Sequence, residues 1–276
     1  MTQRHHRRNI RLATPHSDPP TLPTPRPVLA ASLLTAASMA ASGLVGWIAT
    51  RFLPPMDASF VALGVMTGLA TVFVTTLRWW RDLGLSGPQE WRHLHLFALP
   101  AVLVLIVPFL HGVKPLPLWA AVYLAVGYAL TGFYEELWAR GVLLRVLRPC
   151  GETRAVLVSA LLFGAMHLGN VLYRDPPIVL AQAVGACCFG LAYGALRFRT
   201  NALWVLMALH AMHDFTLRFS NFPPIPLSVA QDILLLGFAG VLLRGSGRGG
   251  QPAPAASGTG TAGTVLTTPR LKRPVR

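Results

Sequence analysis

Residues 118–147 read LWAAVYLAVGYALTGFYEELWARGVLLRVL. The first part of this run, Leu118 to Tyr134, contains no charged residue and is long enough to span most of a ~30 Å hydrocarbon core as a helix. The second part holds Glu135, Glu136 and Arg140, still among apolar residues. Ionisable side chains inside a membrane are costly and usually functional, so the run predicts a transmembrane helix that carries chemistry.

The whole chain has the composition of a membrane protein. Of its 276 residues, 53% are hydrophobic and 12% are charged, about half of the roughly 25% typical of soluble domains. So few charges cannot cover a water-facing surface, which excludes a soluble globular protein. The cysteines, Cys150, Cys187 and Cys188, form no CxxC pair, so we expect small buried residues rather than a disulfide framework or a thiolate zinc site.

Apolar segments separated by proline and glycine recur along the chain and predict an all-α polytopic membrane bundle of about eight transmembrane helices. The segments are residues 28–50, 58–77, 94–112, 118–147, 154–171, 178–196, 201–217 and 226–243. The bundle is expected to occupy residues 28–244, with disordered tails at 1–27 and 245–276. The basic start also fits a signal peptide, but the apolar run after it is too long for one, so we interpret it as the first transmembrane helix.

The net charge of +14 raises the question of nucleic-acid binding, and the distribution of the charge argues against it. If both termini face the cytoplasm, twenty of the 24 Lys and Arg residues fall on the cytoplasmic side of an eight-helix bundle. This is the positive-inside bias, so we predict cytoplasmic termini, no nucleic-acid partner, and basic tails beside a lipid bilayer. Two GxxxG patterns, Gly64–Gly68 and Gly190–Gly194, fit close helix packing, although such patterns have low specificity.

Three of the predicted helices carry ionisable residues within apolar sequence. They contain GFYEELWARG, LLFGAMHLGN and LMALHAMHDF, and their polar members are Glu135, Glu136, Arg140, His167, His210, His213 and Asp214. Such residues usually face the interior of a bundle. At 1.5 Å per residue, Glu135, His167 and His210 lie roughly 16–21 Å from the cytoplasmic ends of their helices. We therefore expect one shared site within the membrane, reachable from the cytoplasmic side.

Helical spacing predicts partners for these groups. Residues four apart share a face, so Arg140 is expected to neutralise and orient Glu136, which leaves Glu135 free. By the same spacing, Asp214 can hold the ring of His210 and set its tautomer, or share a water with it.

A carboxylate with two imidazoles can activate water in two ways. The first uses a divalent metal such as Zn²⁺ bound by Glu135, His167 and His210. In the second, Glu135 acts directly as general base while the histidines polarise a carbonyl group. The sequence contains neither HExxH nor GxSxG, so a zincin pattern and a serine nucleophile elbow are unsupported.

These motifs resemble those of the CPBP family, the CAAX-protease and bacteriocin-processing intramembrane endopeptidases, also called the Abi family. The family's EExxxR, FxxxH and HxxxN or HxxxD motifs are met by Glu135, Glu136 and Arg140, by Phe163 and His167, and by His210 and Asp214. The resemblance covers about residues 118–217, the motif-bearing core, in motif order, spacing and placement on successive helices.

The resemblance implies an α-helical membrane protease with a conical cavity that holds these residues. It implies that Glu135 activates water, that His167 and His210 assist, and that Asp214 helps to shape the oxyanion site. The eukaryotic type II prenyl endopeptidases have Asn at the position of Asp214, so CAAX specificity does not transfer with the resemblance.

The sequence thus predicts an endopeptidase that cleaves a membrane-associated protein or peptide, in a bacterial inner membrane. Two other classes stay open. One is a non-proteolytic membrane scaffold or bacteriocin-immunity factor, which the intact motifs disfavour. The other is a proton-coupled transporter that uses the buried carboxylates, which the lack of an internal repeat disfavours.

Overall fold

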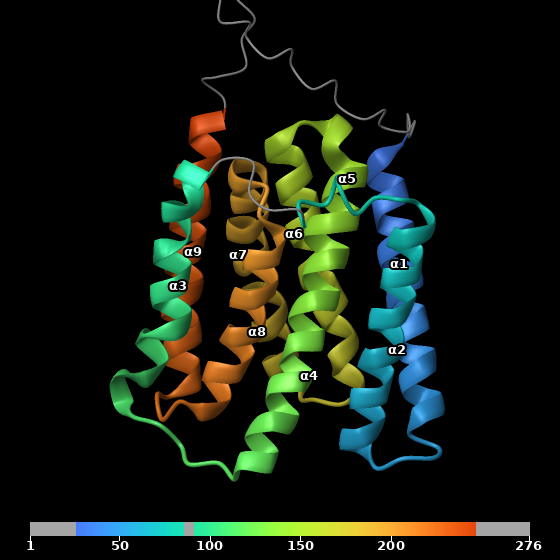
Figure 1. Ribbon diagram of the computed structural model, residues 1–276, viewed down its shortest axis with the longest axis vertical. Coiled ribbons are helices and arrows are strands. Elements are labelled where there is room, and N and C mark those ends of the chain that lie inside the picture. Colours follow the sequence, from blue (N-terminus) through green and yellow to red (C-terminus); the bar gives the residue numbers. More distant parts are fainter. Residues whose placement is uncertain (1–25, 86–90, 247–276) are drawn as a thin grey trace, which may run out of the picture.

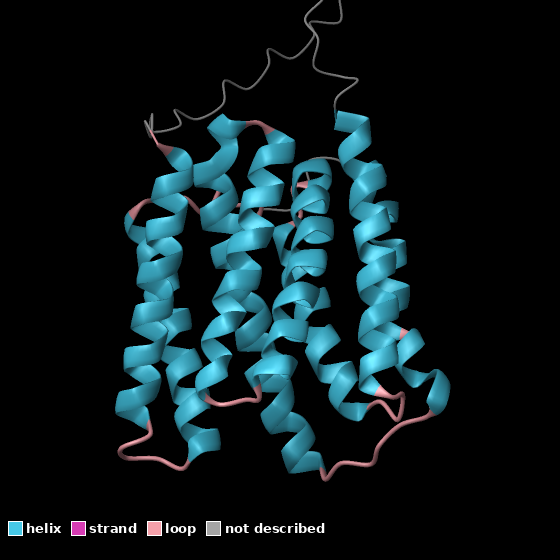
Figure 2. Ribbon diagram, turned by 180° about the vertical axis from the view of Figure 1, so that it is seen from behind, coloured by secondary structure: helices cyan, strands magenta, loops and turns pink. Residues whose placement is uncertain are grey.

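The computed structural model describes residues 26–85 and 91–246, with side chains as far as Arg244. Within these ranges the secondary structure is helical, apart from an isolated bridge between Val113 and Ser220 (Figure 2). The predicted disordered tails lie outside the described residues, except for a few residues at their inner ends.

The described residues form eight helical rods that run side by side along one axis (Figure 1). The rods are α1 (Pro27–Ala49); α2 (Pro55–Thr76); η1 (Trp91–Phe97), α3 (Ala98–Leu105) and η2 (Val107–His111); α4 (Leu118–Glu136), η3 (Leu137–Leu143), α5 (Leu144–Leu147) and η4 (Arg148–Cys150); α6 (Glu152–His167) and η5 (Leu168–Leu172); α7 (Pro176–Thr200); α8 (Leu203–Phe219); and α9 (Pro224–Ser246). The all-α polytopic fold is confirmed, and each predicted apolar segment corresponds to one rod.

By length and composition, six of the described rods can cross a membrane. The two outside that set contain α4 and α8, and both carry charged residues of the motifs. These residues lower the apolar content of both helices, and α8, with 17 residues, is also short.

Prolines set the beginnings of several rods. Pro27, Pro55, Pro176 and Pro224 stand at the first positions of α1, α2, α7 and α9, where the missing N–H has no helical partner to lose. The end of α7 is set by Asn201, whose φ of 52° is left-handed, a conformation that asparagine tolerates better than most residues.

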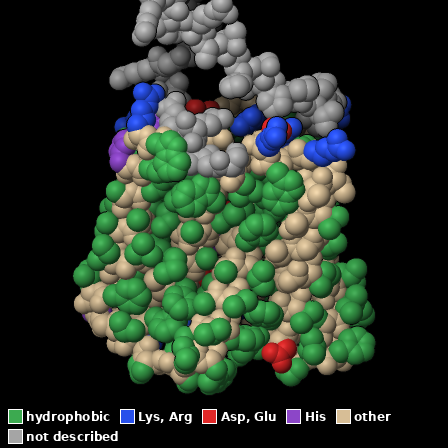
Figure 3. Space-filling model, viewed as in Figure 1, with side chains coloured by type: hydrophobic (Ala, Val, Ile, Leu, Met, Phe, Trp, Pro, Cys, Tyr) green, Lys and Arg blue, Asp and Glu red, His purple; other side chains and the backbone are tan. Residues whose placement is uncertain are grey.

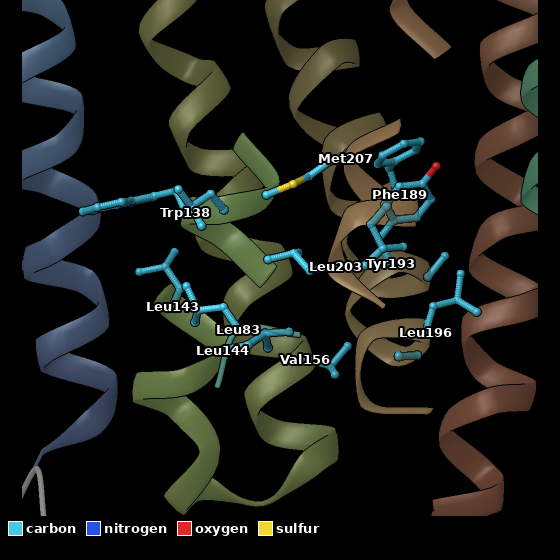
Figure 4. Packing of buried hydrophobic residues seen from close by; sticks show 14 of the residues in the cluster. Leu83, Trp138, Leu143, Leu144, Val156, Phe189, Tyr193, Leu196, Leu203 and Met207 are labelled. Carbon is cyan, nitrogen blue, oxygen red and sulfur yellow. The ribbon is translucent and has the colours of Figure 1, made fainter. Parts of the chain in front are cut away.

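The core lies between the middle rods, where side chains of η3, α6, α7 and α8 interdigitate (Figure 4). A Cβ atom built on Gly190 would lie 3.0 Å from Cα of Ala160, so this glycine allows α7 to touch the backbone of α6. Gly64 and Gly68 have nothing within 4 Å of such an atom. Of the two GxxxG patterns, only the one on α7 is a close packing contact here.

The flank of the bundle is apolar. Figure 3 shows hydrophobic side chains over the side wall, with Lys and Arg gathered at the end where α1 begins and α9 ends. Large exposed residues such as Leu33, Val72 and Ile233 belong to this wall. A wall of this kind faces lipid, so the chain is an integral membrane protein.

Candidate active site

The three motif-bearing rods bring their polar residues to one point. Oε2 of Glu135 on α4 lies 3.8 Å from Nε2 of His167 on α6 and 3.7 Å from Nε2 of His210 on α8. Oδ2 of Asp214, one turn further along α8, lies 4.0 Å from the same nitrogen of His210. The four side chains that the sequence placed in one site do lie together, grouped around Glu135.

Glu136 anchors the other side of this group. It is 0% exposed, and its Oε1 lies 2.9 Å from Nη1 of Arg140, which is 1% exposed. The ion pair predicted from the four-residue spacing is therefore present. The same Oε1 accepts a 2.8 Å hydrogen bond from Nδ1 of His210.

Of the two predicted roles of Asp214, the structure does not show the direct one. Its carboxylate lies 4.0 Å from Nε2 of His210, beyond hydrogen-bond distance, so sharing a water with this ring stays a prediction. Glu136 holds the ring directly, through Nδ1. The physical reason is the direct packing of α4 on α8, which brings a carboxylate from another helix closer than the one on the same helix.

A glycine makes that packing possible. A Cβ atom on Gly132 would lie 2.5 Å from the carbonyl oxygen of Met207 and 2.8 Å from the backbone nitrogen of Ala211. Any side chain at this position would press on the backbone of α8. Gly132 lies one turn before Glu136, so the contact sets the distance between Glu136 and His210.

Arg140 is held on several sides. It lies in η3, a π-helix that begins directly after Glu136, and π-helical turns are frequent at functional sites. Its guanidinium carbon lies 4.1 Å from the ring centroid of Phe163 on α6, a cation–π contact. A Cβ atom on Gly190 would lie 3.4 Å from its Nη2, so the glycine on α7 also leaves the guanidinium its space.

Hydrogen bonds fix which nitrogen of each histidine faces Glu135. Nδ1 of His167 lies 2.9 Å from the carbonyl oxygen of Phe163, and because a carbonyl can only accept, this nitrogen carries the hydrogen. Nδ1 of His210 likewise donates to Glu136. Both rings therefore present Nε2 to Glu135. His213 instead packs its ring against Phe189, with centroids 5.2 Å apart.

A cavity of about 220 Å³ borders Glu135 and His167. Its walls come from α1, the end of α4 and the segment from α6 to α7, and they are Ser38, Met39, Ser42, Gly43, Tyr134, Met166, Gly169, Asn170, Leu172 and Tyr173. The hydroxyl of Tyr134 is joined to that of Ser38 by a 2.7 Å hydrogen bond, which ties α4 to α1 at this wall. The motifs gave no indication of the α1 residues.

Leu172 and Tyr173, which line the cavity, are both exposed. They lie where η5 leads into α7, at the end of the bundle opposite to the one where α1 begins and α9 ends (Figure 1). His167 is the last residue of α6, and only the short η5 separates it from this connection. Access to the site from the cytoplasmic side stays a prediction.

Metal binding gains no support from the geometry. Within residues 26–85 and 91–246, no group of three or more His, Cys, Asp and Glu side chains is arranged to hold a metal ion. Glu135, His167 and His210 as metal ligands remain a prediction, and no step below uses a metal.

A comparison with models of protein families gives a match over the motif-bearing rods. Residues 117–216 match the family model described as Type II CAAX prenyl endopeptidase Rce1-like. The matched segment runs from the start of α4 into α8 and contains all six predicted site residues. No curated protein and no solved structure matches the chain.

Proposed function

Because residues 117–216 form a domain of the Rce1-like type II CAAX prenyl endopeptidase family, we propose that this intramembrane endopeptidase cleaves a membrane-associated protein or peptide with water activated by Glu135. The family gives the class of enzyme, and one observation supports the choice of Glu135. Its Oε2 is buried, has no hydrogen-bond partner among the described residues, and faces Nε2 atoms from two different helices.

The spacing of these atoms suits a bound water. The distances of 3.8 and 3.7 Å are too long for direct hydrogen bonds and have the length of water-bridged contacts. A water at this point donates one hydrogen to Oε2 of Glu135 and the other to the lone pair on Nε2 of His167. Both acceptors hold the water in a fixed orientation beside the cavity.

Glu135 then acts as the general base. It takes a proton from the water while the water oxygen bonds to the carbonyl carbon of the substrate, and the carbonyl electron pair moves onto its oxygen. As the C–N bond breaks, the protonated Glu135 returns the proton to the leaving nitrogen. The products are a carboxylic acid and an amine, and Glu135 is regenerated.

His210 stabilises the oxyanion. Glu136 binds Nδ1 of His210 and Asp214 lies beside Nε2, so two carboxylates favour the positively charged ring. In that form, Nε2–H donates to the negative oxygen of the tetrahedral intermediate. Asp214 acts through this ring, and Glu136 with Arg140 positions it.

The cavity between α1, α4 and η5 receives the substrate. Its lining combines apolar side chains such as Met39 and Met166 with the polar Asn170 and Tyr134, which fits an extended peptide leaving the membrane. The Lys and Arg residues gathered at the end where α1 begins and α9 ends favour a cytoplasmic position for that end, and we place the protein in a bacterial inner membrane. The exposed cavity residues Leu172 and Tyr173 then lie toward the opposite face.

The test compares new protein N-termini in membranes of cells that express wild type or Glu135→Gln at equal level. Glu152→Gln, the same substitution at the far end of α6, is the matched control. We expect N-termini that appear with wild type and Glu152→Gln and fall about 10²- to 10⁴-fold with Glu135→Gln, the usual contribution of a general base. The same cleavages at full rate with Glu135→Gln would overturn the proposal.

A further inference from the structure

A second, polar cavity lies at the other end of the bundle, the end where α1 begins and α9 ends. It measures about 60 Å³ and is bordered by the α2–η1 connection, the rod from η3 to η4, and the end of α7. Its charged and polar lining is Asp82, Arg140, Arg145, Arg148, Arg197 and Asn201. Of these residues, the proteolytic mechanism uses Arg140, through its ion pair with Glu136.

Positive charge exceeds negative charge around this cavity. Four arginines and a single acid line it. Arg145 is paired with Asp82, and Arg140 with Glu136. Arg148 and Arg197 have no acidic partner within the described part of the chain. Two guanidinium charges therefore remain uncompensated at one small cavity.

Of the two unpaired arginines, Arg197 is the stronger indication of an anion site because its side chain is buried. It is 6% exposed, and its Nη2 donates to the backbone carbonyl of Asp82 at 3.1 Å, while Nη1 donates to the side-chain oxygen of Asn201. Both acceptors are uncharged, and the Nε–H of Arg197 has no hydrogen-bond partner among the described residues. A buried charge with neutral partners is costly unless an opposite charge joins it.

Arg140 lines the cavity from another rod, but its guanidinium group lies at Glu136 and over the ring of Phe163. The groups left for a ligand are therefore the unsatisfied Nε–H of Arg197 and the unpaired guanidinium of Arg148. Such donors suit an oxyanion, because guanidinium forks bind phosphate and carboxylate oxygens with paired hydrogen bonds.

The cavity wall is tightly built rather than loose. A Cβ atom on Gly84 would meet the backbone oxygen of Asn201 and lie 3.0 Å from Cζ of Arg197, so only glycine fits there. The carbonyl of Gly84 also accepts a 3.1 Å hydrogen bond from the backbone N–H of Leu203. The guanidinium of Arg145 stacks 4.6 Å from the ring centroid of Trp79, an aromatic residue of the kind that marks the headgroup level.

We propose that this cavity binds a phosphate group, supplied by an anionic lipid headgroup or as free inorganic phosphate. The excess of arginine and the unsatisfied N–H groups supply the recognition. Basic pockets between transmembrane helices at the membrane surface are typical sites for lipid phosphates. The inference is independent of the proteolytic role.

The test measures the melting temperature of the purified full chain in neutral detergent. Inorganic phosphate is titrated against chloride at matched ionic strength, and phosphatidylglycerol is titrated against phosphatidylcholine in mixed micelles. At saturation we expect a rise of roughly 5 °C for wild type. Arg148→Gln should lose most of this shift, while Arg154→Gln, an exposed arginine at the same end that does not line the cavity, should keep it.

The outcomes separate the two sources. A shift with inorganic phosphate identifies the free anion as sufficient, and a shift with phosphatidylglycerol alone identifies the lipid headgroup. Arg197→Gln is a second variant, and if it folds it should also lose the shift. Equal shifts in Arg148→Gln and Arg154→Gln, or no shift with either phosphate source, would overturn the proposal.

Discussion

Glu136 and Glu135 are neighbours on α4, yet they lie in different halves of the site. In the closed half, formed by Glu136, Arg140 and Nδ1 of His210, one carboxylate oxygen has partners at 2.9 and 2.8 Å. In the open half, formed by Glu135, His167, Asp214 and Nε2 of His210, the separations are 3.7 to 4.0 Å. Glu135 is 21% exposed and borders the cavity, whereas Glu136 is fully buried.

The difference separates positioning from chemistry. Successive residues on a helix point about 100° apart, so one of two adjacent carboxylates can face a neighbouring rod while the other faces a cavity. Glu136 is fully buried and does not line the cavity, so its carboxylate is out of reach of the substrate, whereas Glu135 borders the cavity. The closed half fixes the position of the His210 ring through Nδ1, and the open half uses its Nε2 in the proposed reaction.

The largest expected effect comes from breaking the closed half. Arg140→Gln leaves the buried carboxylate of Glu136 without its counter-charge, so we expect a loss of about 3–5 kcal/mol in the free energy of unfolding. Glu135→Gln removes a charge that has no ion-pair partner other than histidine, and we expect a change within about 1 kcal/mol. Equilibrium unfolding in detergent micelles measures both.

A double variant sharpens this result. Arg140→Gln combined with Glu136→Gln removes both charges, and it should recover part of the stability lost in Arg140→Gln alone. Equal destabilisation by Arg140→Gln and Glu135→Gln would contradict the division into two halves.

The next effect tests how the closed half is held together. Gly132→Ala forces α4 away from the backbone of α8, and we expect a loss of about 1–3 kcal/mol with a fall in cleavage rate, because Glu136 and His210 separate. Gly68→Ala, on α2 with open space around it, is the matched control and should leave stability and rate unchanged or slightly improved. Unfolding and cleavage assays of both variants decide this, and equal effects would show that the α4–α8 contact does not position His210.

Sequence patterns predicted the local part of this architecture well. The apolar runs and their prolines located the rods, because both the length of a membrane span and the place of Pro27 or Pro176 depend on nearby residues alone. The Glu136–Arg140 pair followed from helical spacing for the same reason.

The contacts that sequence patterns missed join distant rods. Glu136 and His210 are 74 residues apart in the chain, and their bond depends on the angle and distance at which α4 packs on α8. Same-helix spacing offered Asp214 as a group that holds His210 or shares a water with it, and it gave no indication of Glu136 as a partner. The single sequence signal for the true partner was Gly132, a residue without a side chain one turn before the motif. The wall that α1 contributes to the cavity carried no motif at all.

The smallest effect concerns the outer edge of the open half. Asp214→Asn keeps the shape of the side chain but removes one of the two carboxylates beside His210. Since Glu136 still binds the ring, we expect a roughly tenfold lower cleavage rate, which corresponds to about 1.4 kcal/mol, and unchanged stability. Single-turnover cleavage with unfolding as the control measures this. A loss as large as that of Glu135→Gln would mean that Asp214 itself carries the proton, and the open half would then contain two bases rather than one base and a group that supports His210.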